Sequence, residues 1–165
     1  MNQNNQVLHI CSYYTTSSLY EKMFSKLDEY DIKQIIYVPI QSNSMKKKNR
    51  NFTLKNAEYI YSKNFNTIDR LIYFTKINKI VRDSKKKIDI DKIGIIHAHS
   101  LFINGGVARR LKIMSGKKYI VEVQNTDINL FFKKLRHLKK VGIRILNDAE
   151  QIIFYSPSYK EHLIR

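Results

Sequence analysis

Short apolar segments alternate with segments of helical spacing along most of the chain. The clearest apolar segment covers residues 93–98, and similar runs cover 7–11, 32–38 and 119–123. Between these runs, apolar residues recur every three or four positions, which is the spacing of one buried helix face. This alternation predicts an α/β fold, namely a Rossmann-like, open and mostly parallel sheet with helices on both faces.

The same pattern predicts the individual elements. Strands are expected over residues 7–11, 32–38, 93–98, 119–123 and 151–155, with a short additional strand over 57–61. Helices are expected over residues 67–82, 105–115 and 128–146. A first helix is expected to bury Leu19, Met23, Phe24 and Leu27, and a last helix is expected to open at Ser156-Pro157-Ser158.

Several residues are expected to mark the boundaries of these elements. Pro39 is expected to end the second strand, and the polar residues 41–51 after it are expected to form a mobile loop. Thr67 is a candidate cap for the helix over 67–82, and the basic run 85–87 suits the negative end of the same helix.

The length and composition indicate one domain. The chain has 165 residues and is 43% hydrophobic, which suffices for a single core. Residues 1–165 contain no internal repeat and no linker rich in Gly, Ser or Pro, so they are expected to form one unit. Because the chain stops inside the last predicted helix, a second domain is expected to follow it.

The charge and the single cysteine bear on the binding partners and on the cellular compartment. Thirty Lys and Arg against 14 Asp and Glu give a formal net charge of +16, which attracts nucleic acid, anionic lipid or phosphorylated substrates, although an AT-rich genome also raises the Lys content. Cys11 lies in an apolar run and is expected to be a buried thiol in a reducing compartment. The first six residues do not resemble a signal peptide, so a cytoplasmic location is expected.

The predicted helix over 128–146 has an apolar stripe and a basic surface. The stripe comprises Phe131, Leu135, Leu138, Val141 and Ile145, and the cations are Lys133, Lys134, Arg136, Lys139, Lys140 and Arg144. This pattern is typical of a core helix with a solvated face. A helix that lies on an anionic membrane surface is the alternative, and with no run of ~20 apolar residues any membrane contact is expected to be peripheral.

Candidate chemistry lies where the predicted strands end, because ligands of open parallel sheets bind beyond the carboxyl ends of the strands. Three such junctions are polar. They are Ser12-Tyr13-Tyr14, the segment His97-Ala98-His99-Ser100 together with Asn104-Gly105-Gly106, and Gln124-Asn125-Thr126-Asp127.

His97 and His99 are two residues apart and therefore face the same side of a strand. A metal would require further ligands, which the neighbouring sequence does not supply, so no metal site is expected. His97 is interpreted as a core histidine. His99, at the tip of the strand, is expected to face the crevice and to bind substrate or act as an acid or base.

The other two junctions have both a structural and a functional interpretation. Gly105 and Gly106 either allow a helix to pack closely on the sheet or let backbone N–H groups hold an anion. Thr126-Asp127 is either a helix cap or part of a group that holds sugar hydroxyls. Neither the dinucleotide fingerprint nor the phosphate-loop motif is present, and no cofactor is expected.

The candidate site residues follow from these junctions. The candidate catalytic residues are His99 and Asp127. The candidate substrate-binding residues are Ser12, Tyr13, Ser100, Asn104, Gly105, Gly106, Gln124, Asn125 and Thr126.

Four blocks of the sequence together resemble the N-terminal domain of the family 4 retaining glycosyltransferases, which have the two-domain GT-B fold. The blocks are Ile95-Ile96-His97-Ala98-His99-Ser100, Gly105-Gly106-Val107-Ala108, Tyr119-Ile120-Val121 leading to Thr126-Asp127, and Ile152-Ile153-Phe154-Tyr155-Ser156. Their order and spacing match, and the resemblance covers nearly the whole chain.

The resemblance implies a domain that holds the acceptor, while an absent C-terminal domain holds the nucleotide-sugar donor and no metal is required. It implies transfer of a sugar to a glycan or lipid-linked acceptor in surface polysaccharide synthesis, with the isolated domain inactive. By position it carries over only crevice-lining roles, for His99, Asp127 and the glycine pair. Gln124-Asn125 stands where many members have His-Gly, so the role of that histidine does not carry over.

Two other functions are weighed beside this one. The chain is alternatively a non-catalytic binding module or one subunit of a split glycosyltransferase. A nucleic-acid-binding domain fits the charge, but the sequence contains no helix-turn-helix, zinc-finger or aromatic RNA-binding pattern. Nucleic acid is therefore not the expected partner.

Overall fold

The computed structural model describes residues 6–17, 19–48, 53–66, 69 and 72–164. Among these residues, six parallel strands form one sheet in the order β3-β2-β1-β4-β5-β6, which confirms the predicted α/β, Rossmann-like class. The strands are β1 Gln6–Ile10, β2 Lys33–Ile40, β3 Ala57–Lys63, β4 Ile93–Ala98, β5 Tyr119–Val123 and β6 Gln151–Phe154.

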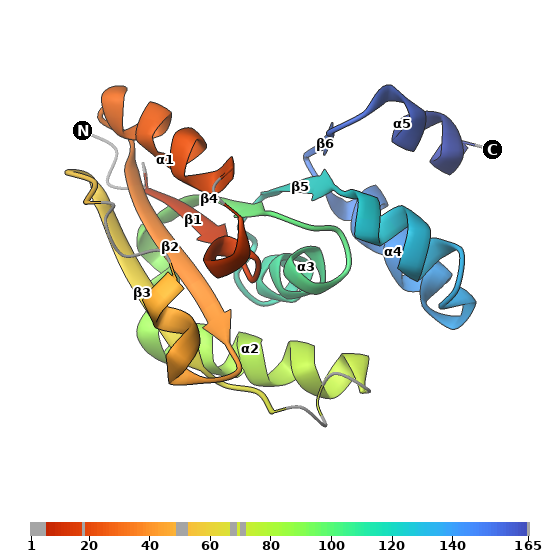
Figure 1. Cartoon of the computed structure of the whole chain (residues 1–165), viewed down its shortest axis with the longest axis horizontal. Coiled ribbons are helices and arrows are strands. Elements are labelled where there is room, and N and C mark those ends of the chain that lie inside the picture. Colours follow the sequence, from red (N-terminus) through yellow and green to blue (C-terminus); the bar gives the residue numbers. More distant parts are fainter. Residues whose placement is uncertain (1–5, 18, 49–52, 67–68, 70–71, 165) are drawn as a thin grey trace.

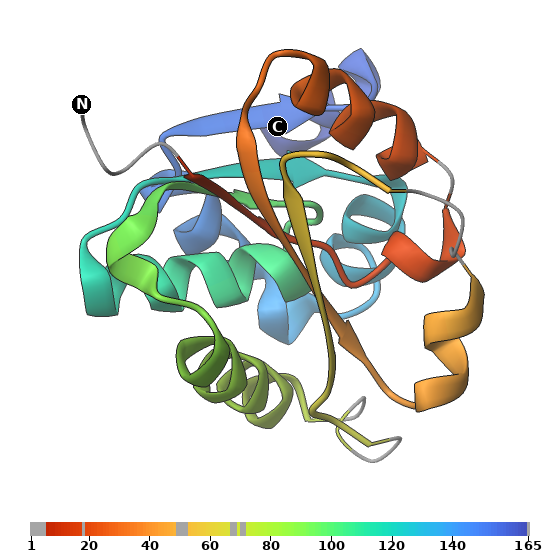
Figure 2. The same ribbon diagram turned by 90° about the vertical axis from the view of Figure 1, so that its left-hand side faces the viewer.

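Helices cover both faces of this sheet (Figure 1). They are α1 Leu19–Glu29, α2 Tyr73–Lys87, α3 Ile103–Ser115, α4 Lys139–Asp148 and α5 Pro157–Ile164. Figure 2 shows α1 on one side of the sheet, and α2 and α3 on the other. Short 3-10 helices at Tyr14–Thr16, Asn43–Lys48, Ile90–Lys92 and Arg136–Leu138 and a π-helix at Asp127–Phe132 complete the described elements.

The alternation of side chains along each strand produces two separate apolar clusters. On β2, Ile35 and Tyr37 join the larger cluster, which includes side chains of α2, α3 and α4. Ile36 and Val38 face the other way and pack with Tyr20 and Phe24 of α1 in the smaller cluster. Cys11 belongs to this smaller cluster and is fully buried, as predicted for its thiol.

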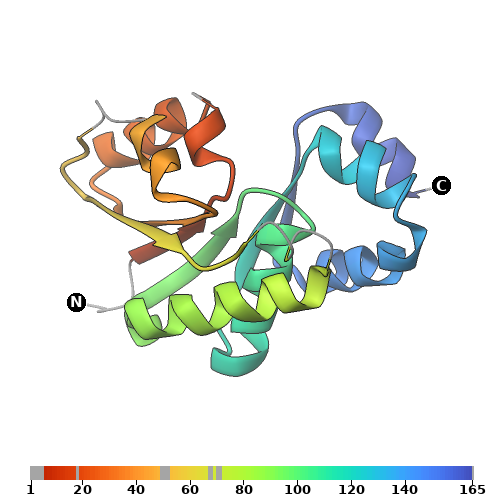
Figure 3. The same ribbon diagram turned by 60° about the horizontal axis from the view of Figure 1, so that its bottom comes forward.

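The order of the strands indicates where a ligand of this sheet is expected to bind. The chain builds outward from β1 to β3 in one direction and then returns to continue from β4 to β6 in the other, so the N-terminal and C-terminal elements lie at opposite ends (Figure 3). The order reverses between β1 and β4, and their carboxyl ends flank the position where open α/β sheets bind ligands.

The predicted end of the second strand was wrong. Pro39 lies inside β2 and is paired in register with Ser62 of β3. Proline lacks the N–H that a central strand normally donates, but β1 pairs with β2 only as far as Tyr37. The N–H that Pro39 lacks therefore lies beyond the last residue of β2 that pairs with β1, so no bond between these strands is lost.

Two further boundaries differ from the expected ones. Part of the expected loop over 41–51 is a 3-10 helix, and residues 49–51 lie outside the described residues. The helix α2 begins at Tyr73, and the candidate cap Thr67 also lies outside the described residues. In the first helix, Tyr20 and Phe24 are the buried side chains, whereas Leu19 is 50% exposed.

The single helix expected over 128–146 is three shorter pieces. A π-helix, a 3-10 turn and α4 follow one another, and Leu135 between the first two has the non-helical angles φ −99° and ψ 59°. Leu138 and Ile145 are nevertheless buried, so the apolar stripe predicted the inward side correctly. Where the π-helix meets the start of α3, the ring of Phe102 stacks on that of Phe131 and meets that of Phe132 edge to face.

Close packing explains the first glycine of the predicted pair. A Cβ at Gly105 would lie 2.9 Å from a methyl group of Ile145, 3.0 Å from one of Val121 and 3.3 Å from the carbonyl oxygen of Ser100. The absence of a side chain therefore lets α3 approach both β5 and α4. This geometry favours the packing interpretation over the anion-binding one.

We predict that Gly105→Ala lowers the free energy of unfolding by about 1–3 kcal/mol, as overpacking does. In a free helix the same change would stabilise by about 1 kcal/mol, so a loss reports the contacts with Ile145 and Val121. Urea denaturation measures the change, with the exposed Asn147→Ala on α4 as the control. A Gly105→Ala variant as stable as the wild type would contradict the packing interpretation.

Candidate functional site

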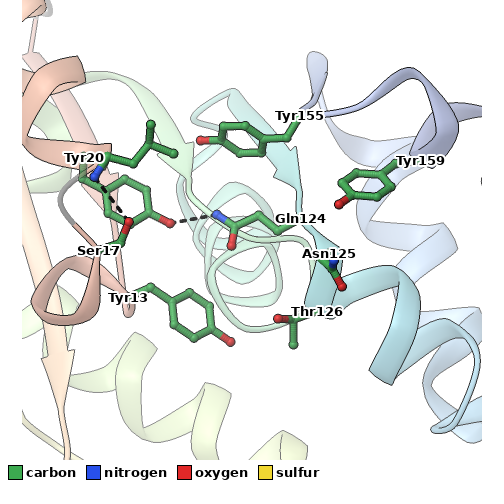
Figure 4. Close-up of a pocket in the computed structure, with 9 residues that line it drawn as sticks. Tyr13, Ser17, Tyr20, Gln124, Asn125, Thr126, Tyr155 and Tyr159 are labelled. Atoms are coloured by element: carbon green, nitrogen blue, oxygen red, sulfur yellow. Dashed lines mark hydrogen bonds between the residues drawn. The ribbon is translucent and has the colours of Figure 1, made fainter.

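A pocket of about 370 Å³ opens at the carboxyl edge of the sheet (Figure 4). Its walls come from the segment after β1, the start of α1, the segment after β5, and the chain from β6 into α5. The lining residues are Tyr13, Ser17, Leu19, Tyr20, Gln124, Asn125, Thr126, Tyr155 and Tyr159. The volume is in the range of small-molecule sites.

Gln124 lies in the middle of this pocket, with tyrosine rings around it (Figure 4). Its amide nitrogen donates to the hydroxyl of Tyr20 at 2.8 Å and to the backbone carbonyl of His99 at 2.6 Å. Both bonds use the nitrogen, and no described residue donates to the carbonyl oxygen of Gln124. The side chain is thus held in one orientation with an acceptor left for a ligand.

The lining is aromatic and polar but uncharged. Four of the nine described lining residues are tyrosines, and the others include two amides and two hydroxyls. Tyr155 is 45% exposed, so part of its ring is open to a ligand. Tyrosine rings present apolar faces beside a polar tip, and amides and hydroxyls supply paired donors and acceptors. Such a pocket suits a neutral, polyhydroxylated ligand.

The structure places the predicted substrate-binding residues in two groups. Four of them line the pocket: Tyr13, Gln124, Asn125 and Thr126. The remainder, Ser12, Ser100, Asn104, Gly105 and Gly106, are not among its lining residues. Asn104 is fully buried and its side-chain oxygen accepts the backbone N–H of Ser12 at 3.3 Å, so it joins the loop after β1 to the first turn of α3.

Asp127 holds the edge of the sheet together rather than lining the pocket. Its carboxylate is 2% exposed and accepts the backbone N–H groups of Leu101, Phe102 and Gln124 at 3.0, 3.2 and 2.9 Å. Burial raises the pKa of Asp127 to about 6, although the three N–H donors oppose the shift. The proposed catalytic role of Asp127 receives no support from this geometry.

A second polar group lies buried beneath the pocket, on the side of the sheet that faces α1. His99 Nε2 lies 3.0 Å from His9 Nδ1, and His99 Nδ1 lies 2.9 Å from Glu122 Oε1. His97 Nε2 lies 3.1 Å from the same oxygen of Glu122. The hydroxyl of Tyr155 donates to the other oxygen, Oε2, at 2.9 Å. We call these five residues the histidine–glutamate cluster.

The electrostatics of the cluster favour a charged carboxylate among neutral rings. Burial opposes the charge on Glu122, but the hydrogen bond from His99 and the nearby ring of His97 outweigh it and hold the pKa of Glu122 below its ordinary range. Burial lowers the pKa of His99 to about 4, against the pull of Glu122. Burial, with His99 and His97 nearby, also lowers the pKa of His9 well below its ordinary value.

His99 departs from its expected position, whereas His97 is largely buried, as a core histidine would be. His99 is fully buried under Tyr20 and Phe24 of α1 instead of facing the crevice, whereas the side chain of His97 keeps 12% of its exposure. They do face the same side, with ring centroids 4.2 Å apart. Sequence reasoning missed His9 and Glu122, although a glutamate between Val121 and Val123 in an apolar strand was a signal for a buried, compensated charge.

Tyr155 connects the pocket and the histidine–glutamate cluster. Its ring lines the pocket, while its hydroxyl is bonded to Glu122. The pocket residues Leu19, Ser17, Tyr20, Tyr155 and Tyr159 were not predicted either, because they belong to elements that are far apart in sequence.

Comparisons with known proteins leave the family open. The chain matches no model in a scan of protein families, and a search of curated proteins also finds no match. In the described part of the chain, no helix has both the length and the apolar content needed to cross a membrane.

We predict that Asp127→Asn changes how stability depends on pH. The pKa of Asp127 is about 6 in the folded protein against an ordinary value of 3.8, so the folded state binds the proton more tightly and the contribution of Asp127 to stability falls as the pH rises between these values. Relative to the variant, the wild type should lose about 2 kcal/mol between pH 4 and pH 7. Urea denaturation across this range measures the difference, and parallel curves for the two proteins would refute the shift.

Proposed function

We propose that this domain binds a glycan or lipid-linked sugar acceptor and is the acceptor-side half of a bacterial glycosyltransferase of the GT-B type. The observation that carries the proposal is the uncharged, tyrosine- and amide-lined pocket at the carboxyl edge of the sheet. A sugar ring offers hydroxyls to Gln124 and Asn125 and an apolar face to a tyrosine ring, so it uses both components of this lining.

The sequence and the sheet order support the same proposal. The four blocks that resemble family 4 glycosyltransferases include β4, the start of α3, β5 and β6, and the segments after these strands contribute most of the candidate site. The transfer step itself would use a nucleotide-sugar donor bound by a separate domain. The net charge of +16 would favour an acceptor attached to a lipid pyrophosphate.

We predict that Tyr159→Ala and Asn125→Ala each weaken the binding of a neutral oligosaccharide about tenfold, because each removes one wall or one hydrogen-bonding group of the pocket. Titration calorimetry against a panel of neutral sugars and lipid-linked saccharides measures the affinity. Tyr30→Ala is the matched control, since Tyr30 is 69% exposed and does not line the pocket. Equal binding by all four proteins would rule out this pocket as the site.

A non-catalytic binding module is favoured by one observation. None of the described lining residues is a carboxylate or a histidine, and His99 and Glu122 are buried beneath the pocket. Assays of donor hydrolysis with a panel of nucleotide sugars separate the two functions, because a transferase half regains turnover when a donor-binding domain is supplied and a binding module does not.

The basic segment after β5 supports a peripheral position at an anionic membrane. All six of its cations, Lys133, Lys134, Arg136, Lys139, Lys140 and Arg144, are exposed. Leu130 and Ile143 are each 41% exposed among them. Exposed cations mixed with apolar side chains bind anionic lipid through both attraction and insertion. We include the inner face of the cell membrane in the proposal for this reason.

We predict that replacing Lys133, Lys134, Lys139 and Lys140 with Gln weakens binding to vesicles that contain phosphatidylglycerol by more than about tenfold, since each lysine near an anionic surface contributes ~1 kcal/mol. The control replaces four exposed lysines elsewhere, Lys22, Lys33, Lys55 and Lys63, and removes the same charge. Vesicle co-sedimentation measures both. Equal losses would indicate attraction by net charge alone and contradict a defined membrane-binding surface.

A further inference from the structure

The buried histidine–glutamate cluster has the composition and geometry of a metal site. We propose that His9, His97 and His99 bind one divalent transition-metal ion, such as Zn²⁺, with Glu122 as the acceptor that orients His99. The proposal concerns a different part of the domain from the sugar pocket and does not depend on what the pocket binds.

The three rings converge from different parts of the chain. One nitrogen from each of His9, His97 and His99 lies within 4.8 Å of the other two. His9 comes from β1 and His97 from β4, which are adjacent in the sheet and pair His9 directly with His97. Zn–N bonds of 2.0–2.1 Å in a tetrahedral site place ligand nitrogens about 3.4 Å apart. The 3.0 Å between His9 Nδ1 and His99 Nε2 therefore needs only a small expansion.

Glu122 supplies the outer contact that metal-binding histidines usually have. His99 Nδ1 is bonded to Glu122 Oε1, which leaves Nε2 with its lone pair directed toward His9. A carboxylate that accepts from the second ring nitrogen fixes the tautomer and raises the basicity of the ligand. Tyr155 holds the other carboxylate oxygen, so Glu122 is itself oriented.

Gln34 provides the corresponding contact for His9. Its amide nitrogen donates to the carbonyl of Phe24 at 3.1 Å, which fixes the side chain, and its presence favours the charged form of His9. His9 Nε2, His97 Nε2 and Gln34 Oε1 are all buried, and among the described residues none of the three has a hydrogen-bond partner. When His9 Nδ1 binds a metal, the ring proton moves to Nε2, so this buried atom becomes a donor beside the amide of Gln34.

The charges in the cluster also suit a cation. His9 and His99 are fully buried, and a buried imidazole favours the neutral form that coordinates metals. The negative charge of Glu122 is buried beside them and partly neutralises a bound divalent ion. Imidazole nitrogens are suited to Zn²⁺, Cu²⁺, Ni²⁺ and Fe²⁺ and not to Mg²⁺ or Ca²⁺, which prefer oxygen.

The site is accessible from the face of the sheet that α1 covers only in part. Phe24 of α1 lies over His9 and His99, with ring centroids 4.7 and 5.5 Å away. His97 is further from this helix and retains 12% exposure, and Ile153 on the same face of β6 is 37% exposed. The His97 side of the cluster is therefore the side nearest to solvent.

The test is a titration of tag-free, chelator-treated protein with Co²⁺, which absorbs visible light when bound by nitrogen ligands, followed by displacement with Zn²⁺. We expect one equivalent to bind and Zn²⁺ to raise the melting temperature. His97→Gln and His9→Gln should each lose the absorption, and His137→Gln, at an exposed histidine outside the cluster, should keep it. Glu122→Gln should retain binding but weaken it about 10–100-fold.

The same experiment can overturn the proposal. Absence of a one-equivalent Co²⁺ spectrum in the wild-type protein would show that the cluster is a hydrogen-bonded network without a metal, whatever the variants do. Binding that survives in a folded His97→Gln variant and is lost in His137→Gln would assign the ion to the surface. Circular dichroism of each variant identifies any that fail to fold.

Discussion

A carboxylate in the middle of a β-sheet must be compensated, and the polar interior of this domain is arranged around that of Glu122. An unpaired buried charge costs several kcal/mol. Here Glu122 is surrounded by His97, His99 and Tyr155, which come from β4, the turn after it, and the segment after β6. The strands that carry these side chains are already paired through their backbones. The contacts with Glu122 additionally fix how the side chains are oriented on one face of the sheet. These contacts make up most of the histidine–glutamate cluster and hold the hydroxyl of Tyr155, whose ring lines the pocket.

The pocket forms at the carboxyl edge of the sheet because of the strand directions. Parallel strands all end on one side, so the segments after β1, β5 and β6 meet without being close in sequence. Asp127 and Gln124 then bind the loops together, since the carboxylate accepts three backbone N–H groups and the amide joins α1 to the loop after β4. A site made from several loops on a rigid sheet can change its ligand by changing loop residues while the scaffold stays the same.

The fold was largely predictable because the signals for it are local. The runs 93–98 and 119–123 match β4 and β5 residue for residue. The helix over 128–146 was wrong because an apolar residue every three or four positions does not distinguish a continuous helix from π and 3-10 turns that bury the same side. The site was predictable only at Tyr13, Gln124, Asn125 and Thr126, which directly follow strands. The rest depends on tertiary contacts: His9 and His99 are 90 positions apart, and no periodicity relates them.

The central position of the first strand also affects how the chain can assemble during synthesis. β1 pairs with β2 soon after both have formed, but its other side pairs with β4, which begins only at Ile93. Until then a nascent chain has β1 as an open edge, and that edge carries apolar side chains. Contacts between distant parts of a chain are slow to form. Until β4 has been synthesised, the N-terminal half therefore exposes a strand edge of the kind that promotes aggregation and attracts chaperones.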